Sequence, residues 1–311
     1  MTGRDSSVGP RCGFVALLGA PNTGKSTLVN ALTGAKVSIV SPKVQTTRTR
    51  VLGIVMAGDG PGAAQVVLVD TPGIFLPKRR LDRAMVAAAW QGAADADLVA
   101  LIVDARKCER QTDTDTGRIV EGLVREDRRA ILLLNKIDLL KRDRLLALAD
   151  RMSGEGPFTD IFMISALTGS GIGDFLAHCA ARLPAGPHLF PEDQLSDMPE
   201  RLLAAEITRE KLYLNLYREL PYALTVETET WEDRGDGGVK IEQTIYVQRD
   251  SQKSIVLGKG GQQIGKVGAS AREELEQLFG RRVHLFLFVK VRDKWQDDPA
   301  RYRDWGLDYS A

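Results

Sequence analysis

The sequence predicts an α/β domain with a mostly parallel sheet, followed by a smaller α+β domain. From residue 11 to residue 185, apolar runs suited to buried strands alternate with helical patterns. A proline-rich stretch follows at residues 186–199, and proline neither continues a helix nor pairs in a central strand. Residues 200–311 then combine a long helical pattern with alternating segments. The 311 residues suffice for two cores, and the polar residues 1–10 are expected to form a flexible tail.

The first predicted strand, at residues 13–18, ends in the strongest motif of the chain. Residues 19–26 read G-x-x-x-x-G-K-S and lead into a helix at residues 27–32. Glycines let successive N–H groups face anionic oxygens, and the helix N-terminus adds positive potential. We therefore predict a P-loop NTPase domain in which Lys25 reaches the β- and γ-phosphates and Ser26 binds Mg²⁺. The nucleotide-binding candidates here are Gly19, Pro21, Asn22, Thr23, Gly24, Lys25, Ser26 and Thr27.

The next predicted strands span residues 51–56 and 65–70, and the second ends in D-x-x-G. This pattern is typical of a sensor for magnesium and the γ-phosphate. Asp70 is expected to hold Mg²⁺ through water, and the Gly73 amide is expected to donate to the γ-phosphate.

A helix at residues 81–94 and strands at 98–104 and 130–135 follow, and Asn135-Lys136-Ile137-Asp138 ends the last of these strands. Open parallel sheets bind ligands at this end of their strands. The Asp138 carboxylate can accept from the ring N–H and the amino group of guanine, a donor pair that adenine lacks. Asn135 can connect this loop to the phosphate loop, and the Lys136 stem can cover one face of the base. The tetrapeptide thus predicts guanine specificity.

The first domain is predicted to close with a helix at 144–152, a strand at 161–165 and a helix at 176–183. The strand leads into Ser165-Ala166-Leu167, where the Ala166 amide is placed to donate to the guanine carbonyl oxygen.

Composition limits the classes of partner. The 42 basic and 41 acidic residues give no global polyelectrolyte signal, so nucleic-acid binding must be local. Three cysteines without C-x-x-C spacing argue against a disulfide scaffold or a zinc site and favour a reducing cytosol. No apolar stretch approaches the roughly 18 residues of a membrane span. We expect a cytoplasmic monomer, with peripheral association at the cytoplasmic face of the inner membrane left open.

Taken in this order, the motifs resemble the Era type of translation-factor-related GTPase. Residues 38–48 (SIVSPKVQTTR) are similar to that family's first switch, whose Q-T-T-R element supplies a threonine to Mg²⁺ in the triphosphate state. The resemblance implies metal binding by Thr46 or Thr47, which the sequence does not distinguish. A mobile loop is the alternative for this segment.

Ile74 stands where many regulatory GTPases place the glutamine that orients the attacking water. The resemblance implies that hydrolysis is organised differently and suggests that Asn22 helps hold a potassium ion near the phosphates. A purely structural role for Asn22 in the loop is equally compatible with the sequence. The resulting catalytic candidates are Lys25, Thr46, Thr47, Gly73 and Asn22.

The second domain is predicted to contain a helix at 200–219, a hairpin of strands 222–231 and 239–248, a helical segment at 251–257, a helix to about 279 and a strand at 283–291. The loop Gly258-Lys259-Gly260-Gly261 joins two of its helices, and this order resembles a type II KH domain. KH loops let two helix ends approach single-stranded nucleic acid. From Arg249 to Lys294 there are ten basic and five acidic residues, which favours RNA binding through Gly258, Lys259, Gly260 and Gly261.

The Era-like pattern extends from about residue 11 to residue 309. It implies a GTPase that uses GTP, GDP and Mg²⁺ and assembles the small (30S) ribosomal subunit by binding the 3′ region of 16S rRNA. The alternative is a nucleotide-dependent signalling switch that acts on a protein or membrane partner. A vestigial nucleotide site is disfavoured because Lys25, Ser26, Asp70 and Asp138 are all present.

Overall fold

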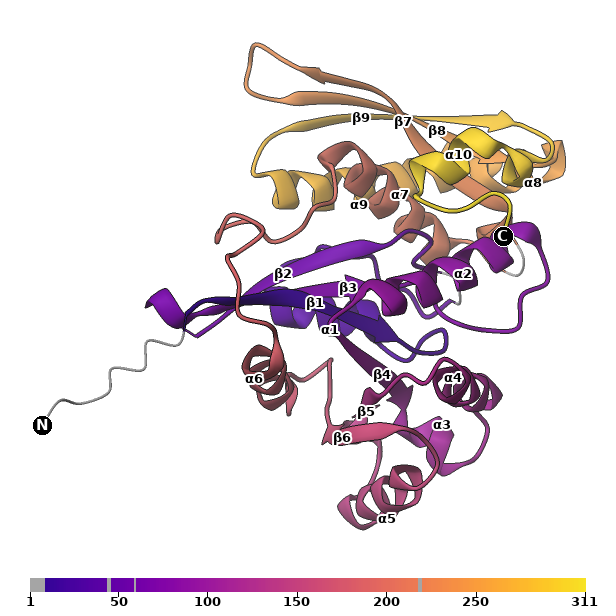
Figure 1. Cartoon of the computed structure of the whole chain (residues 1–311). Coiled ribbons are helices and arrows are strands. Elements are labelled where there is room, and N and C mark those ends of the chain that lie inside the picture. The colour runs from indigo at the N-terminus through magenta and orange to yellow at the C-terminus, as the bar shows by residue number, and fades with distance from the viewer. Residues whose placement is uncertain (1–8, 44–45, 59, 218–219) are drawn as a thin grey trace, which may run out of the picture. The chain divides into compact units, whose positions relative to one another are not determined.

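The computed structural model describes residues 9–43, 46–58, 60–217 and 220–311 (Figure 1). Its chain divides into two compact units. The first contains residues 1–38, 47–197 and 305–311, and the second contains residues 39–46 and 198–304. Val44 and Gln45 of the switch-like segment, most of the predicted tail and the end of the helix predicted to reach residue 219 lie outside the described residues.

The first unit is organised around a sheet with the order β2-β3-β1-β4-β5-β6. The strands are β1 (Arg11–Leu18), β2 (Val51–Ala57), β3 (Ala64–Asp70), β4 (Leu98–Asp104), β5 (Ala130–Asn135) and β6 (Phe158–Met163). Only β2 runs antiparallel to its neighbour. The predicted mostly parallel sheet is confirmed, and its parallel strands are apolar runs because both faces are covered.

Helices cover both faces of this sheet. On one face, α1 (Lys25–Thr33) and α6 (Ile172–Arg182) bury residues such as Leu28 and Phe175. On the other, α2 (Arg80–Asp95), α4 (Thr114–Arg125) and α5 (Arg142–Ser153) contribute Ala89, Ile119 and Leu148 to a separate cluster. The short helix α3 (Ala105–Glu109) follows β4 directly. The carboxyl ends of β1, β3, β4 and β5 therefore share one edge, where their loops can form a site.

Two elements in the first unit begin three or more residues away from their predicted starts. Strand β6 occupies 158–163 instead of 161–165, because as an edge strand it includes the polar Thr159 and Asp160. Ser165 lies beyond it and forms an isolated bridge with Ser170, to whose carbonyl oxygen its amide donates at 2.9 Å. Helix α6 begins at Ile172 instead of residue 176, immediately after Gly171, whose φ of +71° is left-handed.

The proline-rich segment is anchored to the first unit. The Ile54 amide donates to the Leu195 carbonyl at 2.9 Å, and Ser196 forms an isolated bridge with Gly53 on the edge strand β2. The fully buried side chain of Gln65 accepts from the amides of Leu189 and Phe190 at 2.8 and 3.0 Å. These contacts fix the segment's course without a helix or central strand, as proline requires.

The second unit contains a three-stranded sheet with the order β7-β8-β9. Its elements are α7 (Glu200–Asn215), β7 (Leu224–Asp233), β8 (Val239–Val247), α8 (Asp250–Leu257), α9 (Gln262–Phe279), β9 (Val283–Val291) and α10 (Pro299–Asp304). The hairpin of β7 and β8 is antiparallel, whereas β8 and β9 are parallel. The predicted α+β arrangement is confirmed.

Helix α7 ends at Asn215 because Leu216 adopts an extended backbone and packs into the core of the second unit. The short α10 was not predicted from the sequence. Across the described ranges of both units, none of the helices combines the length and apolar character needed to traverse a lipid bilayer.

Candidate nucleotide site and nucleic-acid loop

The phosphate loop joins β1 to α1 and has the backbone shape that an anion cradle requires. Gly24 is left-handed at φ +103°, and a Cβ there would lie 2.3 Å from the Asn135 amide nitrogen. A Cβ on Gly19 would lie 2.4 Å from the Ile102 carbonyl oxygen. Only glycine fits either position. Asn22 also has a positive φ of 64°, a conformation that asparagine tolerates.

Lys25 folds back over this loop. Its Nζ donates to the carbonyl oxygens of Gly19 and Ala20 at 3.0 and 3.1 Å. Burial lowers the pKa of Lys25 to about 8, while the nearby Asp70 carboxylate acts in the opposite direction. A phosphate in the cradle would supply a further anionic partner to this buried ammonium.

Three hydroxyl groups converge on Asp70 at the end of β3. Oδ2 of Asp70 accepts from Ser26 Oγ and Ser38 Oγ, each at 2.7 Å. Ser26 Oγ also lies 2.9 Å from Thr47 Oγ1. The other carboxylate oxygen, Oδ1, is buried without a hydrogen-bond partner in the described structure.

The environment of Asp70 fits a divalent cation. Burial raises the pKa of its carboxyl group, although the Ser26 hydrogen bond and the Lys25 charge oppose this shift. A cation would stabilise the ionised form and give Oδ1 a partner. The described residues contain no group of three His, Cys, Asp or Glu side chains able to hold a metal. Hydroxyl groups, one carboxylate and phosphate oxygens instead match the preference of Mg²⁺ for oxygen ligands.

The two candidate threonines occupy different places. Thr47 belongs to the first unit, beside Ser26. Thr46 belongs to the second unit, where its Oγ1 lies 2.7 Å from both Ser41 Oγ and the Lys43 carbonyl oxygen. The structure therefore brings Thr47, and not Thr46, to the serine of the phosphate loop.

Helix α7 holds the segment that contains Thr46. The Val40 amide donates to Glu210 Oε1 at 2.8 Å. Arg209 donates to the Thr46 carbonyl oxygen, and Lys43 donates to the Tyr213 carbonyl oxygen. Arg209 and Glu210 are almost fully buried, so residues 39–46 are an integral part of the second unit.

Asn135 connects three loops of the predicted base site. Its Nδ2 donates to the Thr23 carbonyl oxygen at 2.7 Å, and its Oδ1 accepts from the Ala166 amide at 2.9 Å. The Ala166 N–H, predicted to donate to guanine, is therefore already used in this conformation. The neighbouring Leu167 is 81% exposed.

Asp138 and Lys136 flank this connection. Asp138 is exposed, and its Oδ1 accepts from Ser165 Oγ at 2.7 Å, which orients the carboxylate. Lys136 Nζ donates to the Asn22 carbonyl oxygen and to Asp104 Oδ2, both at 2.7 Å. The lysine stem is thereby held across the loop, as expected of a side chain that covers a base face.

The D-x-x-G loop packs against the phosphate loop. A Cβ on Gly73 would lie 3.0 Å from two atoms of Pro21. The Ile74 amide donates to the Gly19 carbonyl oxygen at 3.1 Å, and the Ile74 side chain is buried in the core. Ile74 therefore does not face a position from which a side chain could orient water.

Two contributors to this site were missed in the sequence. Ser38, which bonds Asp70, begins the switch-like segment 38–48, but nothing in that segment singled out its hydroxyl. Asp104, which bonds Lys136, carried a usable signal because it ends the parallel strand β4 at the ligand-binding edge.

In the second unit, the glycine-rich loop connects α8 to α9. Gly258, Gly260 and Gly261 have φ values of +71°, +60° and +79°. A Cβ on Gly258 would lie 2.6 Å from the Gln263 Cβ, whereas Gly260 and Gly261 face open space. Lys259 is exposed at the tip. The loop thus presents a cation and unobstructed backbone between two helix ends, as a nucleic-acid backbone contact requires.

Comparisons with known proteins match both units. Residues 14–136 match the family described as "50S ribosome-binding GTPase", and residues 219–296 match the KH domain family. GTPase Era of Afipia carboxidovorans is 58% identical over 299 residues, covering 96% of this chain and 95% of the relative. GTPase Era of Rhizobium meliloti is 56% identical over 311 residues, covering 99% and 97%.

Two solved structures of Era proteins are similar to this chain over nearly its whole length. One is a variant of Era from Aquifex aeolicus bound to GDP and AlF4⁻, with a TM-score of 0.88 and 38% identity, covering 95% of this chain and 99% of that one. The other is Era in complex with MgGDPNP and nucleotides 1506–1542 of 16S ribosomal RNA, with the same TM-score and identity, covering 95% and 98%.

Proposed function

Because this chain belongs to the Era family of GTPases, we propose that it binds and hydrolyses GTP and assembles the small ribosomal subunit by binding the 3′ region of 16S rRNA. The observation that carries the proposal is the similarity, over 95% of this chain, to an Era protein solved with MgGDPNP and nucleotides 1506–1542 of 16S rRNA. That relative holds both proposed ligands on one polypeptide.

Guanine recognition is assigned to the loops around Asn135. Asp138, oriented by Ser165, accepts from the two guanine donors, and Lys136 covers one face of the base. The Ala166 amide exchanges Asn135 for the guanine carbonyl oxygen when the base enters. Phosphate recognition is assigned to the backbone of residues 19–27 and to Lys25, whose ammonium leaves the loop carbonyls for the β- and γ-phosphates.

Ser26 and Thr47 are proposed to hold Mg²⁺, with Asp70 acting through water. This assignment is supported by the 2.9 Å separation of the two hydroxyl oxygens and by the unpartnered Oδ1 of Asp70. When bound, Mg²⁺ neutralises charge on the β- and γ-phosphates. The amide of Gly73 donates to the γ-phosphate. Thr46 is not assigned to the metal because its hydroxyl bonds Ser41 and Lys43 in the second unit.

Hydrolysis proceeds without a glutamine beside Gly73, because residue 74 is an isoleucine whose side chain is buried in the core. Asn22 is proposed to help hold a potassium ion beside the phosphates, which would offset charge that develops during phosphoryl transfer. Two features of Asn22 support this proposal. The residue lies within the phosphate loop, and its backbone is left-handed, with a φ of 64°.

The glycine-rich loop of the second unit is proposed as the RNA contact, with Lys259 binding phosphate and Gly258, Gly260 and Gly261 allowing close approach. We place the protein in the cytoplasm as a monomer and propose that any attachment to the inner membrane is peripheral. Three free cysteines support a reducing compartment.

The full-length protein tests this function in two assays. Phosphate release should depend on GTP, and filter binding should detect a single-stranded oligonucleotide with the sequence of the 3′ end of 16S rRNA. A duplex of equal length should bind more weakly, because KH loops bind unpaired strands. GTP hydrolysis without this preference would instead favour a signalling switch with a protein or membrane partner.

A further inference from the structure

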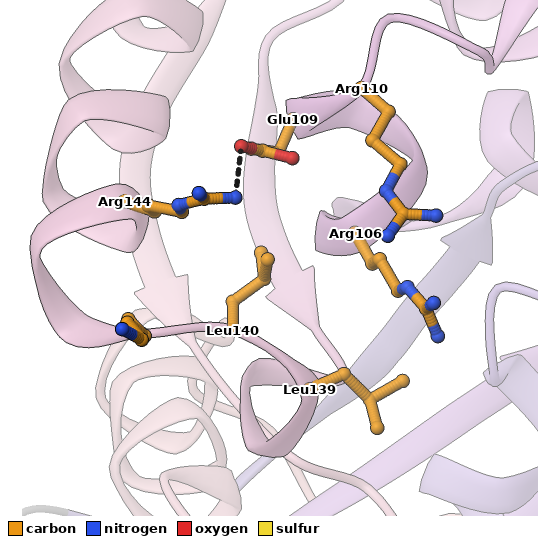
Figure 2. Close-up of a pocket in the computed structure, with 7 residues that line it drawn as sticks. Arg106, Glu109, Arg110, Leu139, Leu140 and Arg144 are labelled. Atoms are coloured by element: carbon orange, nitrogen blue, oxygen red, sulfur yellow. Dashed lines mark hydrogen bonds and ion pairs between the residues drawn. The ribbon is translucent and has the colours of Figure 1, made fainter.

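A cationic cavity lies in the first unit, outside the residues assigned to GTP. It is formed by α3, by the 3₁₀ turn η2 (Ile137–Leu139) and by the start of α5. Its volume is about 240 Å³, and its walls are shown in Figure 2. The lining residues are Arg106, Glu109, Arg110, Leu139, Leu140, Lys141 and Arg144.

The acidic side chain that lines this cavity is already paired. Glu109 accepts from Arg144 at 3.1 Å, the ion pair drawn as a dashed line in Figure 2. Asp104 accepts from the first amides of α3 and from Lys136 at 2.7 Å. Neither carboxylate therefore offers a free countercharge to the remaining cations.

Three cations of the cavity stay uncompensated. Within the described part of the chain, the side chains of Arg106, Arg110 and Lys141 make no hydrogen bond or ion pair, and all three are exposed. Figure 2 shows Arg106 and Arg110 across the cavity from Arg144. By contrast Arg151, farther along α5, donates to the Cys108 carbonyl oxygen and pairs with Glu155. Clustered like charges repel, so an anionic partner would stabilise this arrangement.

The size and lining of the cavity favour part of a polymer over a small molecule. Pockets for complete small-molecule ligands measure roughly 300–1,000 Å³. This cavity is smaller, but its guanidinium groups match the geometry of phosphate oxygens. Leu139, which is 50% exposed, offers an apolar surface to an adjoining sugar.

We propose that this cavity binds the phosphate backbone of RNA, as a second contact in addition to the glycine-rich loop. The inference rests on the proposed function, because it assumes that a structured RNA is the partner. It adds a phosphate-binding surface on the nucleotide-binding unit, made by Arg106, Arg110 and Lys141. Phosphate contacts of this kind position a protein on RNA without reading its sequence.

The test compares two charge-reversal variants of the full-length protein. Arg106→Glu with Arg110→Glu removes the cavity's free guanidinium groups. Arg125→Glu with Arg129→Glu makes the same change in charge at exposed positions before β5, whereas the cavity adjoins the turn after β5. Binding to folded, deproteinised 16S rRNA and to the 3′-terminal oligonucleotide is measured over a range of salt concentrations, with GDPNP present throughout.

The cavity variant should bind 16S rRNA about tenfold more weakly than the control variant, and its log–log salt slope should be shallower by about 1.5, as expected for two lost phosphate contacts. Its GDPNP affinity should equal that of the control. Equal rRNA affinity and salt slope in the two variants would overturn the proposal. A deficit on intact 30S subunits but not on the deproteinised RNA would also overturn it, by pointing to an acidic ribosomal protein.

Failure of the proposed function gives a different result. In that case the parent protein binds neither the oligonucleotide nor 16S rRNA above the level of a duplex of equal length. If the parent binds both RNAs but the two variants behave alike, only the cavity assignment fails.

Discussion

Asp138 shows how a single carboxylate can decide the choice of base. It is exposed and held by the Ser165 hydroxyl at 2.7 Å, so its oxygens are oriented before a ligand arrives. Hydrogen bonds to a charged group contribute about 1.5–3 kcal/mol each, and adenine offers no equivalent donor pair. When ATP occupies the site, the Asp138 carboxylate is left without these two donors, and ATP therefore binds more weakly than GTP.

Replacing Asp138 with Asn should reverse this preference. The asparagine amide can donate to the additional carbonyl oxygen of xanthine. Affinity for GTP should fall by more than about 100-fold, because two hydrogen bonds to a charged group, worth about 1.5–3 kcal/mol each, are lost. Affinity for XTP should rise. Calorimetry with GTP, XTP and ATP measures both changes. Tight ATP binding by the parent protein would contradict the assignment of Asp138.

The two adjacent threonines allow a matched comparison. Thr47→Ala removes the hydroxyl beside Ser26, whereas Thr46→Ala removes one that bonds Ser41 and Lys43 in the second unit. Thr47→Ala should slow GTP hydrolysis by about tenfold or more and raise the Mg²⁺ concentration needed for half-maximal rate, as expected from a lost charge-assisted contact. Thr46→Ala should leave this Mg²⁺ requirement unchanged. The opposite pattern in magnesium titrations would assign the metal to Thr46.

Asn22 is best tested with a change that spares the backbone. Its φ of 64° would strain alanine, whereas glycine accepts it, so Asn22→Gly removes the side chain alone. The parent should hydrolyse GTP at about 10⁻⁴ to 10⁻² s⁻¹ without a partner, and potassium should accelerate it relative to sodium. The variant should lose this difference. Equal parent rates in the two salts would remove the cation from the mechanism.

At the scale of elements, sequence patterns predicted the boundaries of buried central strands better than those of the edge strand β6. The boundaries of the central strands β4 and β5 agree with those predicted, since each strand is an apolar run with clear ends. The start of β6 was placed three residues late, because an edge strand needs no continuous apolar run. The hydrogen bond by which the Val40 amide reaches Glu210 of α7 joins residues 170 positions apart, so it leaves no local signature in the sequence.

The glycine-rich loop between α8 and α9 can be altered without disturbing its helices. A Cβ on Gly260 meets no atom within 4 Å, and aspartate tolerates its left-handed φ of +60°. Lys259→Asp with Gly260→Asp should therefore fold but place two carboxylates against an RNA backbone, and RNA affinity should fall sharply. Filter binding to the 3′-terminal 16S rRNA oligonucleotide measures this loss.

The hairpin of β7 and β8 provides the matched control for that experiment. Arg234→Asp with Gly237→Asp makes the same change in charge on an exposed turn, and Gly237 has a comparable φ of +80° with no atom within 4 Å of its added Cβ. This control should bind RNA like the parent. Full RNA binding by the Lys259 and Gly260 variant would mean that the second unit contacts other partners.

At the scale of the whole molecule, the chain passes between the two units more than once. It enters the second unit at Ile39, returns at Thr47, leaves again at Met198 and returns at Trp305. Each unit nevertheless has its own apolar clusters, such as that around Leu101 and Leu132 in the first and that around Leu212 and Ile245 in the second. Separate cores are the physical basis for separable binding functions.

Reciprocal variants should therefore separate nucleotide binding from RNA binding. Lys25→Ala removes the buried ammonium of the phosphate loop and should weaken GTP binding by at least about tenfold, the value of one charge-assisted contact. In nucleotide-free protein it should leave affinity for the 3′-terminal RNA unchanged, because the glycine-rich loop belongs to the other core. The Lys259 and Gly260 variant should show the converse. Calorimetry with GTP and filter binding with RNA, applied to both variants, measure all four affinities. Loss of both activities in either variant, with thermal unfolding like that of the parent, would contradict the separation of the two sites.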